Sequence, residues 1–167
     1  MAIPKQILSY LEKNKIKYEA IEHRPVFTAW DLVQTLHLKK PEEAVKTLIF
    51  NIDNEHVLIL LPPNKNFDKA KFKNLMNGLR KKQGLKGVKK MDFVKEAWMK
   101  KNIKIGKLGA VPPFGKLLNL PVFADNIVLK QKKVLVSGGD HNVSLKISIK
   151  DFIKLEEPIK GSFSQKK

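Results

Sequence analysis

The sequence predicts a single α+β domain: a mixed β-sheet with flanking helices. A chain of 167 residues is the usual length of one domain and buries roughly 70% of its unfolded surface. Segments of helical and of strand periodicity follow each other in mixed order, with hairpins in the middle and near the end. This order argues against a purely parallel βαβ fold. We place the domain at residues 1–158 and a polar, basic tail at 159–167.

The N-terminal third contains two predicted helices and a short strand. Residues 4–14 have a proline suited to a first helical turn and an apolar stripe of Ile7, Leu8 and Leu11. Residues 17–22 are typical of a strand. Thr28 and Asp31 have the spacing of a capping box, which predicts a helix that continues to residue 36.

A β-hairpin is the clearest element of the chain. Residues 44–50 and 56–61 are rich in strand-forming residues, and the turn between them contains Asp53-Asn54. Two prolines directly after residue 61 end the second strand.

Two amphipathic helices are predicted after the hairpin. Asp68 can cap the first, whose apolar residues recur at helical offsets: Phe72, Leu75, Met76 and Leu79. Asp92 is expected to begin the second, with Phe93, Val94, Ala97 and Trp98 directed inward. A shaped loop at 106–115 follows, then strands at 121–124, 133–137 and 143–147, and a helix at 150–155.

Composition narrows the possible classes of protein. The absence of cysteine excludes disulfide scaffolds, thiol nucleophiles and thiolate metal sites. The longest apolar run is too short to cross a bilayer, and the N-terminus lacks the apolar region of a signal peptide. We therefore expect a soluble cytoplasmic protein with no membrane partner.

The positive charge is unusual in size and in distribution. The formal net charge is +17, and residues 61–116 hold 16 basic and three acidic residues, whereas the rest of the chain holds 17 and 13. A patch of this kind fits a polyanion such as nucleic acid. However, 31 of the 33 cations are lysines, and biased composition or solvated helix faces would produce the same excess.

Lys46 is the first candidate for chemistry. It lies in the strongest strand, on the same side as Leu48 and Phe50. A desolvated amine has a lowered pKa and can act as a base or nucleophile, and a charged one can hold a phosphate or a carbonyl. A lysine at the edge of the sheet with its amine in water is the structural alternative.

Two glycine-containing segments are further candidates. The loop Gly109-Ala110-Val111-Pro112-Pro113 can present backbone amides to a carbonyl oxygen, although an ordinary connector has the same composition. The segment Gly138-Gly139-Asp140-His141 is expected in a tight turn between two strands. There His141 either holds an ester or orients water, or is merely exposed beside the turn.

His23 and Thr28 complete the set, with Thr28 equally explained as a helix cap. The four histidines, His23, His37, His56 and His141, have neither the spacing nor the carboxylate neighbours of a zinc site. We expect no metal and no cofactor. A Gly-x-Ser-x-Gly elbow is also missing, which argues against a typical serine hydrolase.

These segments together resemble the YbaK / prolyl-tRNA-synthetase-associated domain family of aminoacyl-tRNA editing deacylases. The resemblance covers roughly residues 3–155. It is carried by the order and spacing of His23-Arg24-Pro25-Val26-Phe27-Thr28, Lys46, Gly109-Ala110-Val111-Pro112-Pro113-Phe114-Gly115, Pro121-Val122-Phe123-Ala124-Asp125 and Gly138-Gly139-Asp140-His141.

The resemblance implies a curved, partly barrel-like sheet and a site in which Lys46, Gly109 and His141 are catalytic. His23, Thr28, Ala110, Val111, Pro112, Pro113, Gly139 and Asp140 would bind the substrate. In this family the water is activated largely by the substrate itself. His141 matches the branch that edits alanyl-tRNA(Pro), whereas Pro112 stands where that branch often has threonine. The resemblance therefore leaves the amino acid open.

The leading hypothesis is a free-standing deacylase that hydrolyses the ester bond of mischarged tRNA. An aminoacyl ester is already reactive, so catalysis needs positioning and oxyanion stabilisation more than a strong nucleophile. Its partners would be the acceptor end of tRNA and an aminoacyl-tRNA synthetase. The alternatives are a non-catalytic RNA- or synthetase-binding module on the same scaffold and a hydrolase of small esters or amides.

Overall fold

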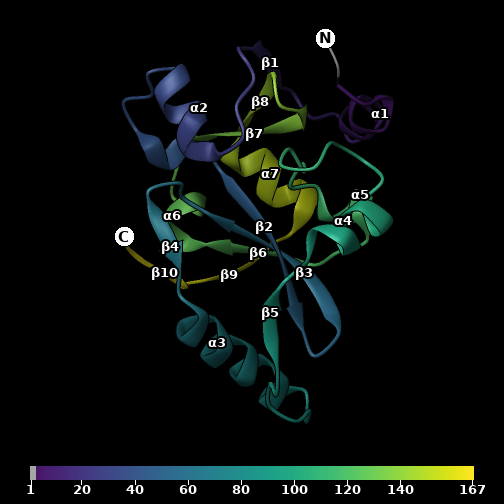
Figure 1. The fold of residues 1–167 in the computed structure, drawn as a ribbon, viewed down its shortest axis with the longest axis vertical. Coiled ribbons are helices and arrows are strands. Elements are labelled where there is room, and N and C mark those ends of the chain that lie inside the picture. The colour runs from purple at the N-terminus through teal and green to yellow at the C-terminus, as the bar shows by residue number, and fades with distance from the viewer. Residues whose placement is uncertain (1–2) are drawn as a thin grey trace.

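Three β-sheets and the helices around them make up residues 3–167, the part of the chain that the computed structural model describes (Figure 1). The largest sheet has the order β5 (Met91–Phe93), β2 (Lys46–Ile52), β3 (Glu55–Leu61), β6 (Val122–Asp125) and β9 (Ile159–Gly161). The β3–β6 and β6–β9 pairs are parallel and the others antiparallel. The predicted α+β fold with a mixed sheet is confirmed.

A second sheet carries β1 (Glu19–Glu22), β8 (Val143–Ser148) and β7 (Lys133–Asp140), all antiparallel. It joins the first through a parallel bridge between Ala44 and Leu135, just before β2 begins. The third is a short antiparallel pair of β4 (Lys65–Phe67) and β10 (Ser164–Lys166).

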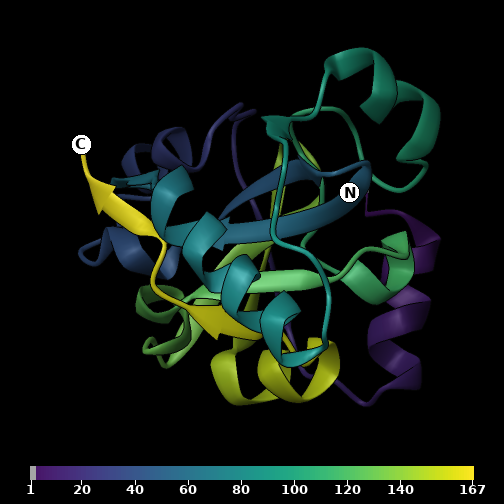
Figure 2. The ribbon, with the colours of Figure 1, turned by 90° about the horizontal axis from the view of Figure 1, so that it is seen from below.

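The helices are α1 (Lys5–Lys13), α2 (Ala29–Thr35), α3 (Lys69–Lys82), α4 (Glu96–Asn102), α5 (Gly115–Leu118), α6 (Asn126–Leu129) and α7 (Ile149–Glu156). A 3-10 turn (Pro41–Glu43) precedes β2. Figure 2 shows α3 lying across the strands of the largest sheet, with α1 set apart from α3.

The two faces of β2 bury different cores. Val45 and Ile49 pack with β7, β8, α1 and α7, whereas Phe50 and Ile52 pack with α3. Successive side chains of a strand point to opposite faces, so each residue of β2 belongs to one core or the other. This alternation fixes which side chains of β2 can reach the space between the two larger sheets.

Most elements of the prediction are present in the structure. The β2–β3 hairpin pairs Phe50 with Val57 and Ile52 with Glu55. The Asp68 side chain accepts a hydrogen bond from the Lys71 amide and so caps α3. The Thr28 hydroxyl oxygen accepts from the Asp31 amide and caps α2, as the capping box predicts.

The prediction of a helix that begins at Asp92 is wrong. Residues 91–93 form β5 instead, in which Phe93 pairs with Phe50 at the free edge of β2. Helix α4 begins only at Glu96, and Phe93 is 51% exposed instead of inward. The exposed edge of β2 pairs with residues 91–93, although the periodicity of this segment favours a helix.

Two further segments differ from expectation. Gly138 to Asp140 continue β7, with an irregular register after Ser137, so the turn falls at residues 141–142. The segment 159–167, expected as a tail, forms β9 and β10. Its Phe163 is fully buried against α3, which a purely polar tail would not allow.

Candidate active site

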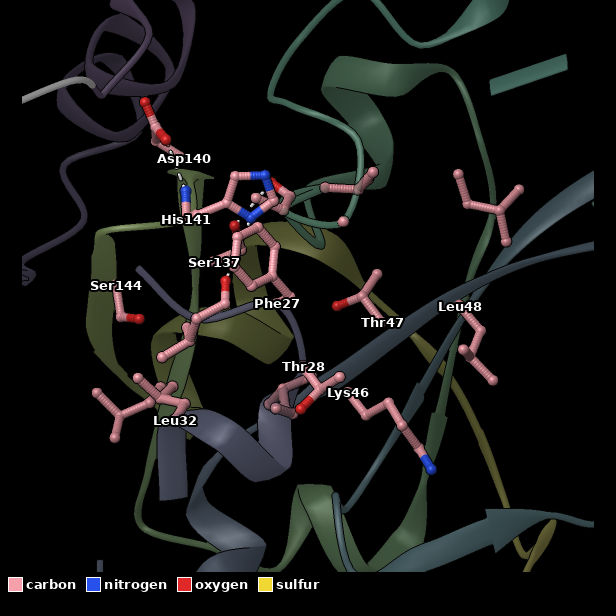
Figure 3. Close-up of a pocket in the computed structure, with 18 of the residues that line it drawn as sticks. Phe27, Thr28, Leu32, Lys46, Thr47, Leu48, Ser137, Asp140, His141 and Ser144 are labelled. Carbon is pink, nitrogen blue, oxygen red and sulfur yellow. Dashed lines mark hydrogen bonds between the residues drawn. The ribbon is translucent and has the colours of Figure 1, made fainter. Parts of the chain in front are cut away.

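A pocket of about 370 Å³ opens between the two larger sheets. Its walls come from the segment before α2, from β2 and β5, from the loop at 109–111 and from β7 and β8 (Figure 3). Apolar side chains make up most of the lining, with a few polar groups among them, as is usual for a small-ligand site. Of the predicted site residues it brings together His23, Thr28, Lys46, Gly109, Ala110, Val111, Asp140 and His141.

Pro112, Pro113 and Gly139 are not part of the pocket wall. Both prolines are buried behind the loop. The Gly139 carbonyl accepts from the Lys107 amide, and a Cβ at Gly139 would come within 2.7 Å of Pro4. These three residues therefore shape the loop and its support instead of facing a ligand.

Lys46 borders the pocket, but its amine is directed to another partner. Its Nζ donates a hydrogen bond of 2.6 Å to the main-chain carbonyl of Lys65 in β4. Figure 3 shows the side chain extending away from Thr28 and Ser137. Burial, and in second place the charge of Lys167, lower the pKa of the Lys46 amine.

Thr47 is the residue of β2 that faces the polar side of the pocket. It shares the strand face of Val45 and Ile49, and its oxygen lies on the side of Thr28 and Ser137 in Figure 3. The strand alternation seen in the sequence already separates it from Lys46. The sequence reasoning nevertheless missed Thr47, because it did not show which face of the strand lines a cavity.

The loop at 109–111 lines the pocket, and only part of its backbone is hydrogen-bonded within the protein. The Ala110 amide is used within the turn, where it donates to the Lys107 carbonyl at 2.8 Å. Within residues 3–167, the amides of Gly109 and Val111 donate to no protein acceptor. The donors available to a carbonyl oxygen are thus those of Gly109 and Val111, whereas the sequence pointed to Gly109 and Ala110.

Ser137 holds this loop against β7 and was also missed. Its hydroxyl donates to the Ala110 carbonyl at 2.7 Å and accepts from the Gly139 amide at 3.1 Å. The side chain lines the pocket. A lone serine before two glycines gives no sequence signal for this bridging role.

His141 is held on three sides. Its Nδ1 donates to the Val26 carbonyl at 3.2 Å, because a carbonyl can only accept. The ring lies 4.7 Å from that of Phe27, and its Cε1 is the nearest atom to where a Cβ of Gly109 would stand. This tautomer leaves Nε2 as an acceptor in the neutral ring.

Asp140 fixes the backbone next to His141. Its carboxylate accepts from the His141 amide at 2.7 Å and pairs with the Lys107 amine at 3.0 Å. The hydrogen bond from Lys107 holds the pKa of Asp140 below its usual range. The carboxylate is therefore ionised at neutral pH and already has partners, so it orders the strand end more readily than it could act as a base.

His23 and Ser144 form a serine–histidine pair at the pocket wall. The Nδ1 of His23 donates to the Arg24 carbonyl at 2.8 Å, so Nε2 accepts from the Ser144 hydroxyl at 2.9 Å. The main chains of these segments are also joined, since the His23 amide donates to the Asn142 carbonyl. The pair thus extends the β1–β8 ladder, and Ser144 is almost fully buried.

The described residues 3–167 contain no cluster of three or more metal-ligating side chains. None of the helices in this part of the chain is long and apolar enough to span a membrane. The chemistry on offer is positioning: backbone amides, hydroxyls and an imidazole around an apolar cavity, bordered by a lysine.

Fold and pocket together define a small α+β domain with a pocket between two sheets. The family model of the aminoacyl-tRNA editing domain matches residues 23–155. The chain belongs to the aminoacyl-tRNA editing domain family. This confirms the resemblance seen in the sequence, and the matched range includes every residue of the pocket wall.

Known proteins of this kind are similar over most of the chain. The prolyl-tRNA editing protein ProX of Acetoanaerobium sticklandii is 26% identical, over 89% of this chain and 87% of its own length. A proline–tRNA ligase of Desulfotalea psychrophila is also 26% identical over 81% of this chain, which spans only 24% of the ligase. A solved structure described as a candidate trans-editing enzyme for prolyl tRNA synthetase has a TM-score of 0.77 at 19% identity, covering 99% and 98% of the two chains.

Proposed function

We propose that this chain is a free-standing aminoacyl-tRNA deacylase that hydrolyses the ester bond of mischarged tRNA in the pocket described above. The observation that carries the proposal is a single cavity lined by the Gly109 loop and His141, with Lys46 at its border. The family supports a tRNA substrate. The names of the relatives support tRNA that prolyl-tRNA synthetase charges, and a synthetase as partner.

The geometry suggests a division of roles. The amides of Gly109 and Val111 receive the ester carbonyl as negative charge develops on its oxygen. The free Nε2 of His141 accepts a hydrogen bond from the substrate or from the attacking water. Lys46, at the border of the pocket, holds the phosphate of the terminal nucleotide after its amine leaves the Lys65 carbonyl.

Steric exclusion supplies the selectivity in this scheme. The inner wall carries branched apolar side chains, among them Leu32, Val45, Ile49 and Leu135. A cavity of this kind admits a small aminoacyl side chain and rejects a larger one, which is the logic of a second sieve.

The test is turnover on a panel of mischarged tRNAs, with release of free amino acid as the readout. The proposal expects catalytic release from at least one member that carries a small side chain. Binding of tRNA without release across the whole panel would refute the deacylase and favour a non-catalytic binding module. If the chain hydrolyses free amino acid esters as fast as mischarged tRNA, it is a small-molecule hydrolase instead.

A further inference from the structure

Lys46 lines one side of the pocket, and three further lysines lie on or directly after the two strands β4 and β10 beside it. We call Lys46, Lys65, Lys166 and Lys167 the lysine cluster. Lys46 donates to the Lys65 carbonyl, and Lys65 is the direct register partner of Lys166 across β4 and β10. The charge of Lys167 reaches Lys46. The Lys167 amine also lies 5.8 Å from the centre of the half-exposed Trp30 ring. Trp30 directly follows the pocket residue Ala29 in the sequence.

None of the four amines of the lysine cluster takes part in an ion pair within the described range 3–167. The acidic groups nearby are engaged otherwise: Glu42 accepts from the Asn64 side chain, and Asp68 caps α3. Like charges directly opposite each other on two antiparallel strands are destabilising, so the Lys65–Lys166 pair has a cost that an anionic ligand would remove.

The C-terminal segment that contains β10 and supplies Lys166 and Lys167 is firmly attached to the domain. Phe163 is fully buried; its amide donates to the Asp125 carboxylate at 2.9 Å and its carbonyl accepts from the Asp68 amide at 2.8 Å. Lys71 donates to the Ser164 carbonyl. The main chain leading to Lys166 and Lys167 is therefore fixed beside β4, as Figure 1 shows.

This strand lies outside the region that the editing-domain model matches, which ends at residue 155. Lys166 and Lys167 therefore add to the lysine cluster two cations from a segment that the family model does not describe, whereas Lys46 and Lys65 lie within the matched region. Lys46, the member of the cluster that lines the pocket, lies on the other side of the pocket from His141 (Figure 3).

We propose that the lysine cluster binds backbone phosphates of the unpaired 3′ strand of tRNA where that strand enters the pocket. The inference rests on the proposed function, because it takes the pocket to be the site of the 3′ end. An extended single strand suits the arrangement, since lysine amines on neighbouring strands can follow successive phosphates as point charges without reading sequence.

The experiment measures the affinity of the full chain for unacylated tRNA over a series of salt concentrations. The variant Lys166→Ala/Lys167→Ala removes two cations from exposed positions. Loss of two phosphate contacts on a single strand lowers the slope of log K against log salt by about 1.4 in magnitude. We expect this change, and weaker binding at low salt.

Two controls separate the cluster from net charge. Lys150→Ala/Lys154→Ala removes the same charge from exposed positions on α7, which lies well away from β10 in Figure 2, and should leave the slope unchanged. Lys166→Arg/Lys167→Arg keeps the charge and should keep the slope. With an RNA hairpin that lacks the unpaired 3′ strand, wild type and Lys166→Ala/Lys167→Ala should bind equally.

An unchanged salt slope for Lys166→Ala/Lys167→Ala would overturn the inference, as would an equal loss in the α7 control. Neither result depends on hydrolysis, because the RNA carries no amino acid. A wild-type chain that hydrolyses mischarged tRNA while the slope does not change would leave the proposed function intact and refute only the phosphate site. A chain that shows the slope change but never hydrolyses mischarged tRNA would support the phosphate site and refute the proposed deacylase.

Discussion

Replacing Gly109 with alanine tests whether the loop and His141 form one unit. The backbone of Gly109 has a φ of +83°, which L-residues rarely adopt. An added Cβ would stand 3.1 Å from Cε1 of His141. That ring is fixed by its hydrogen bond to the Val26 carbonyl and by Phe27, so either the ring or the loop has to move.

The structure allows the size of the effect to be estimated. A left-handed backbone conformation costs a non-glycine residue about 1–2 kcal/mol. The contact adds a displacement of a few tenths of an ångström at the centre of the pocket. Since a misplacement of 1 Å can cost about a hundredfold in rate, we expect Gly109→Ala to lower kcat/KM for deacylation by roughly tenfold.

The assay combines urea unfolding with deacylation of the mischarged tRNA that the panel identifies. Gly78→Ala is the matched control: Gly78 lies in α3, and a Cβ there meets no atom within 4 Å. That substitution should stabilise the protein by about 0.5–1 kcal/mol and leave activity unchanged. Wild-type activity and stability in Gly109→Ala would refute the coupling of loop and imidazole.

Three further predictions concern stability and the polar pair. Phe163→Ala should cost about 3–5 kcal/mol in urea unfolding, because the ring is fully buried against Phe72; a loss below 1 kcal/mol would mean that the C-terminal segment is not part of the core. Ser144→Ala should lower deacylation less than tenfold, and the wild type should show no acyl-enzyme by mass spectrometry, because Ser144 ties β8 to His23; an acyl group on Ser144 of the wild type, together with complete loss of activity in the folded variant, would make Ser144 a nucleophile. The Arg80 side chain, followed by the amides of Lys90 and Lys89, holds the pKa of Asp53 below its ordinary value of 3.8. The stabilisation from Asp53 is thus present above pH 3.8 and is lost as pH falls through the native pKa. Asp53→Asn should therefore make unfolding free energy fall less steeply below about pH 4, and an unchanged pH profile would contradict this.

Local signals explain what the sequence predicted of the fold. The β2–β3 hairpin and α3 each combine periodicity with a turn or cap inside a short stretch, and both are present. β5, β9 and β10 have only three residues each, and their pairing depends on neighbouring strands distant in sequence. No local pattern specifies such edge strands, which is why the sequence predicts a helix start at Asp92 where the structure has β5.

The sequence also predicted part of the candidate site and missed the rest. The glycine loop and His141 were chosen from residue type and from the resemblance, and both line the pocket. Thr47 and Ser137 were missed because their roles depend on which strand face meets the cavity and on which carbonyl lies within reach. Ala110 was chosen for its amide, but the turn itself uses that amide.

Removal of the Lys46 amine tests the central claim most directly. The measurement is the single-turnover rate of deacylation at saturating enzyme, for Lys46→Ala and for Lys71→Ala. Lys71 is a matched control, since its amine also donates to a main-chain carbonyl, that of Ser164, but the residue does not line the pocket. The account predicts loss of deacylation in folded Lys46→Ala and a near-normal rate in Lys71→Ala. Full activity in folded Lys46→Ala would contradict it.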